Sequence, residues 1–236
     1  MRLDRFLSDM GVSSRAQTKK AVRLSAVTVN GSTVKKSDIQ IDEVNDKVVY
    51  YGEYVPYEKF TYIMLNKPSG YISATDDRSK KTVLDLLSQR LVKRELFPCG
   101  RLDIDTVGLL ILTNDGQLAH ALLSPKHHAE KVYRFKTDSP LPVGAEKRVS
   151  DGLVLDDGYE CLSAGLTLDS ERTSGTITLT EGKFHQIKRM LHTLGGECIF
   201  LERISFGGVA LDASLSRGEY RALTGEEIAM LERYRV

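Results

Sequence analysis

The spacing of apolar residues predicts two helices and a hairpin at the N-terminus. The first helix is expected over residues 3–10, where four apolar side chains recur at the spacing of one helix face: Leu3, Phe6, Leu7 and Met10. A serine pair at 13–14 can cap a second helix over about residues 15–24. Asn30-Gly31 then lies between β-branched residues, which is the strongest short-range signal for a hairpin. A last strand at about residue 48 and a linker complete this block, residues 1–58.

The pattern changes to short strands in the body of the chain. Apolar runs predict strands at 60–65, 109–112, 131–136 and 176–180, and a second hairpin around Asp156-Asp157-Gly158. Short helices are expected near residues 82–87, 118–123, 142–149 and 185–194. No glycine-rich loop joins a strand to a helix, so a nucleotide cofactor is not expected. We predict an α+β fold with a largely antiparallel or mixed sheet, divided into domains at residues 1–58 and 60–236.

Composition and charge add an asymmetry to this picture. The chain is 41% hydrophobic and 28% charged, with no apolar run that could span a bilayer, so we expect a cytoplasmic protein without a membrane partner. The net charge is only +1, yet residues 1–36 hold eight lysines and arginines against two aspartates, a net charge of +6. A basic block of this kind predicts a polyanionic partner. The three cysteines are widely spaced, which favours neither a disulfide framework nor a zinc site.

The basic residues of the first block gather on one side of its second predicted helix. Arg15, Lys19 and Arg23 are four residues apart and share a face that no acidic residue interrupts, although most such faces are merely solvated. The order of elements resembles the RNA-binding module of the ribosomal protein S4 type. The resemblance implies that the module holds structured RNA through phosphates and shape. The expected RNA-binding residues are Arg2, Arg5, Arg15, Lys19, Lys20 and Arg23.

A charged run bounded by Gly100 and Gly108 leads directly into the buried strand predicted at 109–112. Asp103 lies in this run, and a carboxylate there is costly to desolvate unless something compensates it. Asp105 is two residues further on, which in extended backbone places the two α-carbons about 6–7 Å apart. Paired carboxylates at such a spacing could hydrolyse a glycosidic bond. The alternative is that Asp105 bonds its own turn and leaves Asp103 as the reactive group.

A second charged cluster lies on the helix predicted from residue 185. Its apolar residues form one face, and its cations form a stripe displaced around the axis: His185, Lys188, Arg189 and His192. The stripe begins at a strand-to-helix turn, where free N–H groups favour an anion. The two histidines are seven residues apart with no third ligand in register, so we expect no metal site.

Together these motifs resemble the RNA pseudouridine synthases. The resemblance rests on Gly100-Arg101-Leu102-Asp103-Ile104-Asp105-Thr106-Val107-Gly108-Leu109, Ser124-Pro125-Lys126-His127-His128-Ala129-Glu130-Lys131-Val132-Tyr133 and Gly182-Lys183-Phe184-His185-Gln186-Ile187-Lys188-Arg189-Met190. It extends to 65–71 and 218–224, and so covers essentially the whole chain. The branch that it resembles most is the one that acts on small-subunit ribosomal RNA.

The resemblance implies an isomerase that converts a specific uridine of ribosomal RNA, most simply 16S, to pseudouridine without a cofactor. It assigns the catalytic carboxylate to Asp103, its basic partner to Lys188 and the ring that stacks on uracil to Tyr133. Substrate contacts are expected from Arg101, His185, Gln186 and Arg189. Lys188 replaces the arginine of other branches, so it offers a point charge rather than a bidentate fork.

Several alternatives stay open at this point. Asp103 could attack C1′, add to the base, or remove the C2′ proton. The substrate could be 23S instead of 16S RNA, either free or in a partly assembled small ribosomal subunit. The chain could also be a non-catalytic RNA-binding factor in ribosome assembly. A monomer is the default, since no coiled coil or self-complementary patch is evident.

Overall fold

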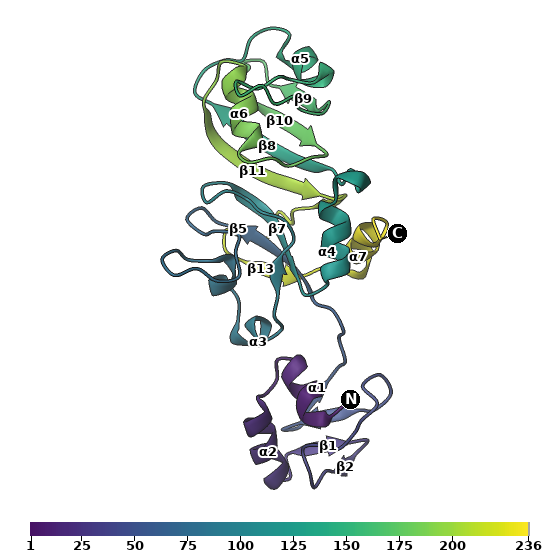
Figure 1. Cartoon of the computed structure of the whole chain (residues 1–236). Coiled ribbons are helices and arrows are strands. Elements are labelled where there is room, and N and C mark those ends of the chain that lie inside the picture. The colour runs from purple at the N-terminus through teal and green to yellow at the C-terminus, as the bar shows by residue number, and fades with distance from the viewer. Residues whose placement is uncertain (236) are drawn as a thin grey trace. The chain divides into compact units, whose positions relative to one another are not determined.

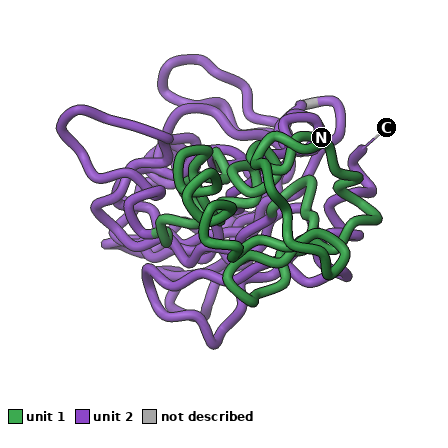
Figure 2. The backbone as a smooth tube through the Cα atoms, turned by 90° about the horizontal axis from the view of Figure 1, so that it is seen from below, with its two compact units in different colours: residues 1–61, 87–96 green, residues 62–86, 97–236 purple. Residues whose placement is uncertain are grey.

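A computed structural model describes residues 1–235, apart from the side chain of Pro125, and shows two compact units (Figure 2). The first unit comprises Met1–Thr61 together with Leu87–Leu96, and the second comprises the rest of the chain. The division expected from the sequence, 1–58 and 60–236, differs from these units at residues 60–61 and 87–96.

Within residues 1–61, the first unit combines two helices with a four-stranded antiparallel sheet (Figure 1). The helices are α1 (Leu3–Asp9) and α2 (Arg15–Arg23). The strands, in the sheet order β2-β1-β3-β4, are β1 (Val27–Val29), β2 (Ser32–Thr33), β3 (Val48–Tyr50) and β4 (Glu53–Val55). The predicted helix, helix, hairpin order is confirmed. The pattern missed β4, which the sequence analysis had treated as linker.

Local sequence explains where these elements begin and turn. Ser14 and Gln17 form a reciprocal capping box at the start of α2. Asn30 and Gly31 both have positive φ, the conformation that a two-residue hairpin turn requires. Tyr51 and Gly52 repeat this arrangement between β3 and β4. The apolar faces of α1 and α2 pack with Val27 and Val48 into one small core.

Residues 87–96 join the first unit through one buried arginine. They contain α3 (Gln89–Val92), after which Arg94 turns inward. The Arg94 guanidinium donates to the Thr61 hydroxyl at 2.9 Å and to the carbonyls of Asp9 at 2.7 Å and Glu58 at 2.5 Å. A buried charge is stable only when its donors are satisfied, and here residues distant in sequence satisfy them. Periodicity does not encode such a contact, which is why the pattern assigned this segment elsewhere.

The second unit is built on one mixed sheet whose main path is β13-β5-β7-β11-β8-β10-β9 (Figure 1). The strands on this path are β5 (Tyr62–Lys67), β7 (Val107–Thr113), β8 (Lys131–Thr137), β9 (Gly165–Leu168), β10 (Ser174–Leu179), β11 (Cys198–Phe206) and β13 (Tyr220–Ala222). β6 (Phe97–Pro98) pairs with β7, and β12 (Val209–Ala210) pairs with β11. Every pairing is antiparallel except that of β7 with β11, so the predicted mixed sheet is confirmed.

β11, the strand that joins the two halves of this sheet, was not predicted. Its sequence places Glu202 and Arg203 in the middle of an apolar run, and both side chains are buried. The expected hairpin around Asp156-Asp157-Gly158 forms as a turn with one isolated bridge, Val154 to Glu160, rather than as two strands.

The helices of the second unit lie on the faces of the sheet. They are α4 (Gly116–Leu123), α5 (Ala145–Asp151), α6 (Gln186–Thr193) and α7 (Gly225–Glu232), with 3-10 turns at Val83–Leu86 and Pro125–His127. α4 and α7 lie side by side in Figure 1 and share a core with Met64, Leu109 and Phe206. Within residues 1–235, no helix is long and apolar enough to cross a membrane.

Candidate active site

Asp103 lies in the loop that leads from β6 into β7. Both glycines that bound this run adopt positive φ. A side chain at Gly108 would bring its Cβ within 2.3 Å of the Arg203 carbonyl oxygen, so the start of β7 can press against β11 only because this residue is glycine. The Ser73 hydroxyl bonds both the N–H and the carbonyl of Leu102 at 3.0 Å. The backbone on both sides of Asp103 is therefore fixed.

A buried lysine that the sequence analysis did not single out holds this loop. The Lys67 side chain at the end of β5 is fully buried. Its ammonium donates to the main-chain carbonyls of Asp103 at 3.0 Å, Ile104 at 3.3 Å and Thr106 at 2.8 Å. Burial lowers the pKa of Lys67 to about 8, against the opposing charges of Asp105 and Asp103. The available signal was a lysine two residues after the apolar run at 63–65.

Lys188 of α6 and His185, the residue that precedes this helix, face the Asp103 carboxylate. Lys188 Nζ lies 3.3 Å from Asp103 Oδ2, and His185 Nε2 lies 3.6 Å from Asp103 Oδ1. His185 has a left-handed backbone conformation (φ 48°) at the start of the helix, so it turns its ring back toward the loop. The structure thus brings together the carboxylate, the basic partner and one of the expected substrate contacts.

Asp105 makes the shortest contact with Lys188, at 2.6 Å between Oδ1 and Nζ. Burial acts to raise the pKa of Asp105, but the hydrogen bond and charge of Lys188 outweigh it and leave that pKa below its ordinary value. The pKa of Lys188 is raised, because both carboxylates outweigh the effect of its burial. Asp105 bonds its own backbone N–H, as expected of a turn-former, and its carboxylate also bonds Lys188, which the sequence analysis did not predict. The turn is closed by the Thr106 N–H, which donates to the Asp103 carbonyl.

The other polar residues of α6 are engaged away from Asp103. Gln186 is buried, accepts from the Lys183 N–H at 2.9 Å and donates to Glu181 at 2.6 Å, so it shapes the turn before the helix. Arg189 pairs with Asp157, and His192 pairs with Glu197. The cation stripe is therefore an array of ion pairs instead of a free anion-binding face. Direct substrate contacts by Gln186 and Arg189 stay predictions that this geometry does not favour.

Tyr133 is placed by the sheet rather than by a bond to Asp103. It lies opposite Arg203 in the β8–β11 ladder, and Arg203 lies opposite Gly108 in the parallel β11–β7 ladder. At one strand spacing per step, the α-carbons of Tyr133 and Gly108 are about 10 Å apart. Tyr133 is buried, with 8% of the residue exposed. Arg101 is exposed and has no hydrogen bond or ion pair to any residue in the described part of the chain.

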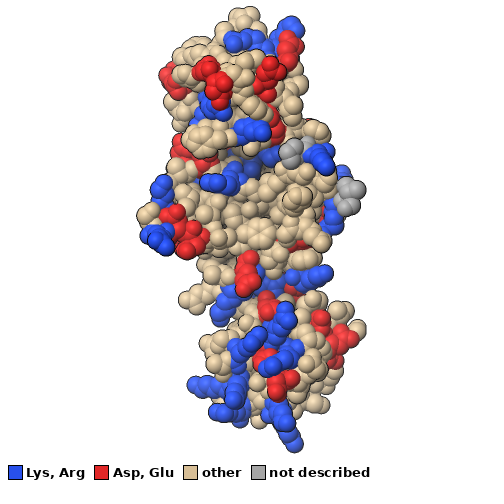
Figure 3. Space-filling view, viewed as in Figure 1, with Lys and Arg blue, Asp and Glu red and all other residues tan. Residues whose placement is uncertain are grey.

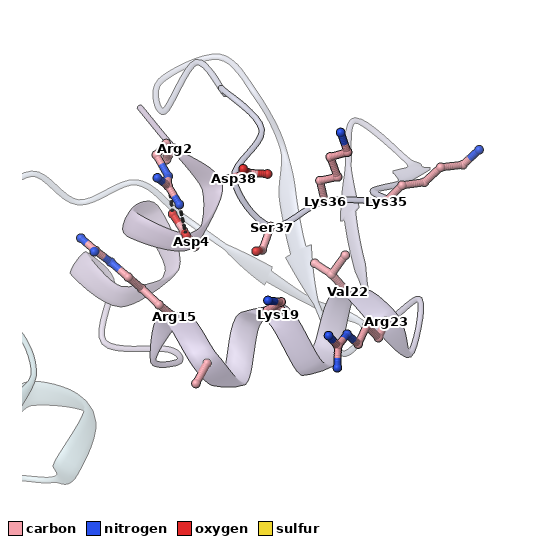
Figure 4. Close-up of a pocket in the computed structure, with 11 residues that line it drawn as sticks. Arg2, Asp4, Arg15, Lys19, Val22, Arg23, Lys35, Lys36, Ser37 and Asp38 are labelled. Carbon is pink, nitrogen blue, oxygen red and sulfur yellow. Dashed lines mark hydrogen bonds and ion pairs between the residues drawn. The ribbon is translucent and has the colours of Figure 1, made fainter.

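The first unit presents a basic hollow of about 480 Å³ beside α2 (Figure 4). Arg15, Lys19 and Arg23 line it, as expected, and Figure 3 shows lysines and arginines gathered on this unit. Lys35 and Lys36, from the segment after β2, complete the same wall and were not predicted as part of it. Two predicted RNA contacts are already paired with acids: Arg2 with Asp4 and Arg5 with Asp9. Lys20 is exposed but does not line the hollow.

Comparison with known proteins matches this arrangement to one class of enzyme. The family model described as RNA pseudouridylate synthase matches residues 61–193, and the model of the S4 domain matches residues 1–48. The chain belongs to the RNA pseudouridine synthase family, whose members are isomerases, and it carries an S4 domain at its N-terminus.

Relatives match the chain over nearly its full length. It is 44% identical to an uncharacterized RNA pseudouridine synthase of Bacillus subtilis, over 98% of each chain. It is 38% identical to ribosomal small subunit pseudouridine synthase A of Escherichia coli, over 97% of this chain and 99% of the relative. A crystal structure of a pseudouridylate synthase superposes with a TM-score of 0.69 at 37% identity, covering 98% of this chain and 99% of the other.

Proposed function

We propose that this protein isomerises a uridine of ribosomal RNA to pseudouridine, and that its substrate is 16S RNA. The proposal rests on the position of Asp103. Lys67 bonds its main-chain carbonyl, and its carboxylate faces Lys188 and His185. Full-length similarity to relatives named as small-subunit enzymes supports 16S over 23S. The protein is expected to act in the cytoplasm as a monomer, on free RNA or on a partly assembled small subunit.

The proposed reaction needs one carboxylate and no added group. The N1–C1′ bond breaks, uracil turns in the site, and C5 bonds to C1′; the C5 proton leaves and N1 gains a proton, so the product has the mass of the substrate. Asp103 is the proposed reactive carboxylate, Lys188 its counter-charge, and Tyr133 the ring against the extruded uracil, a contact worth about 1–3 kcal/mol. Arg101 is free to occupy the place of the flipped base or to hold a phosphate.

Release of tritium from 5-tritiated uridine tests the chemistry. Wild-type protein should release tritium from 16S RNA, and Asp103→Asn should abolish release while RNA affinity stays nearly unchanged. Release by Asp103→Asn at the wild-type rate would refute the assignment of Asp103. No release by wild-type protein, from free RNA or from assembly intermediates, would instead favour a non-catalytic assembly factor.

The choice of RNA is tested separately. Sequencing of carbodiimide-modified ribosomal RNA from a deletion strain should show the loss of one 16S pseudouridine. Loss of a 23S position alone would overturn the choice of substrate without affecting the proposed chemistry.

A further inference from the structure

Phe184 is an exposed aromatic ring beside the proposed catalytic carboxylate. Its side chain is 78% exposed, although burial of an apolar ring is favourable. Its ring stacks on the imidazole of His185, with centroids 3.8 Å apart and planes 18° apart. The edge of that imidazole lies 3.6 Å from Asp103 Oδ1. One face of Phe184 is thus covered by a residue of the site, and its remaining surface faces outward.

The loop that carries Phe184 is held rigidly from inside. Gln186 fixes the Lys183 N–H and also bonds Glu181. Glu181 in turn accepts from the Tyr159 hydroxyl at 2.7 Å and from the Leu162 N–H at 2.9 Å. Lys183 lies over the Tyr159 ring, 5.4 Å from its centroid. The exposed ring is therefore presented in a fixed position, which reduces the entropy lost when a flat partner stacks on it.

We infer that Phe184 and His185 form a stacking platform for the base of a nucleotide next to the target uridine. The inference rests on the proposed function, because it needs RNA at Asp103. Single-stranded bases are commonly held by exposed aromatic rings, since every base has a π-face. Extruding the target uridine unstacks its neighbour, so a ring at the rim of the site can replace the lost stacking partner. The target uracil itself lies against Tyr133 in this arrangement.

Substitutions at Phe184 test the platform in the tritium-release assay. Phe184→Ala should raise KM by roughly 5- to 150-fold, the equivalent of losing one base–aromatic stack, and should change kcat little. Phe184→Trp should preserve KM, whereas Phe184→Leu should behave like Phe184→Ala because it keeps an apolar side chain without a π-face. Val143→Ala removes another exposed apolar side chain, 92% exposed, and serves as the control with unchanged KM.

An abasic nucleotide on one side of the target uridine provides the decisive measurement. Wild-type protein should bind the abasic RNA as weakly as Phe184→Ala binds the intact RNA. The affinity of Phe184→Ala should be the same for both RNAs. Equal KM values for wild type and Phe184→Ala on intact RNA would overturn the inference. So would a difference in KM between the two proteins that stays the same when both neighbours of the target uridine are abasic. A fall in kcat alone would assign the ring to uracil instead.

These outcomes are distinguishable from failure of the proposed function. Inactive wild-type protein would refute the function, whereas active wild-type protein with an indifferent Phe184→Ala variant refutes only the platform. Filter binding of the same RNAs gives the affinity comparison independently of turnover.

Discussion

Replacing Lys67 by methionine removes the ammonium that holds the Asp103 loop and leaves a side chain of similar length. The pKa of Lys67 is lowered from 10.5 to about 8 by burial, so the charged form is destabilised in the folded protein by about 3 kcal/mol. Hydrogen bonds from a charged donor contribute about 1.5–3 kcal/mol each, and the ammonium has three N–H groups. Lys67→Met loses three such bonds but no longer bears the cost of about 3 kcal/mol for burying the charge. The free energy of unfolding at pH 7 should therefore fall by about 1.5–6 kcal/mol.

The low end of that range is favoured, because two of the carbonyls keep another donor. The Asp103 carbonyl still accepts from the Thr106 N–H, and the Ile104 carbonyl from the Gly70 N–H. The functional effect should be larger than the effect on stability, since a displacement of about 1 Å in a reacting group lowers the rate about 100-fold. Lys67→Met should therefore reduce kcat by about two orders of magnitude, with RNA affinity unchanged. Single-turnover tritium release measures the first quantity and filter binding the second.

The pH dependence of stability gives an independent check with a defined sign. Between about pH 8 and 10.5 the unfolded state binds a proton at Lys67 that the folded state has lost, so this group makes the folded state more stable as pH rises. The stability difference between wild type and Lys67→Met should grow by about 3 kcal/mol over this interval in urea titrations. Lys80→Met, at an exposed lysine of the same unit, is the control. A difference that stays constant with pH, or a kcat equal to that of Lys80→Met, would refute the role of Lys67.

Two further predictions address the fold around the site and the RNA-binding hollow. Gly108→Ala should lower the free energy of unfolding by at least about 2 kcal/mol in urea titrations, since its Cβ would meet the Arg203 carbonyl, whereas Gly116→Ala, in open space at the start of α4, should change it by less than about 1 kcal/mol. Equal effects of the two substitutions would contradict the close approach of β7 and β11. Combined replacement of Arg15, Lys19 and Arg23 by alanine should weaken RNA binding and lower the magnitude of its salt slope by about 3, with kcat retained at saturating RNA. An unchanged slope would place the RNA elsewhere.

Local sequence patterns were enough for much of the fold. Helix periodicity located α1, α2 and α6, and Asn30-Gly31 located the first hairpin, because these signals depend on residues close in the chain. β11 was missed because Glu202 and Arg203 interrupt its apolar run. Their burial depends on distant partners: Glu202 pairs with Arg134 and Arg217, and Arg203 donates to the Leu109 carbonyl.

The same distinction applies to the site. The motif resemblance placed Asp103, Lys188 and His185 in one site, and they meet there in the structure. It could not reveal that Lys67 holds the loop, because the bonds run to main-chain carbonyls some forty residues away. Nor could it show that Arg189 is paired with Asp157, which lies outside the helix pattern; Glu197, the partner of His192, is only five residues further on and was open to sequence reasoning. Pairing across the fold is the information that one-dimensional spacing lacks.

The two carboxylates beside Lys188 differ in a way that supports the proposed role of Asp103. Asp105 is 63% exposed and makes a short charge-assisted hydrogen bond to the ammonium, whereas Asp103 is 28% exposed and lies 3.3 Å from it. A carboxylate engaged in a short bond must break that bond before it can react, so the looser contact suits the reactive group.

The same reasoning explains why a lysine at position 188 suits this site. An arginine could grip both oxygens of Asp103 with its planar fork, while a lysine offers a single charge that Asp105 already orients. Asp103 then takes its position from the backbone, through Lys67 and Ser73, and keeps its oxygens available. Lys188 and Asp105 thus act together: Asp105 holds the Lys188 ammonium close to Asp103 without fixing the Asp103 carboxylate.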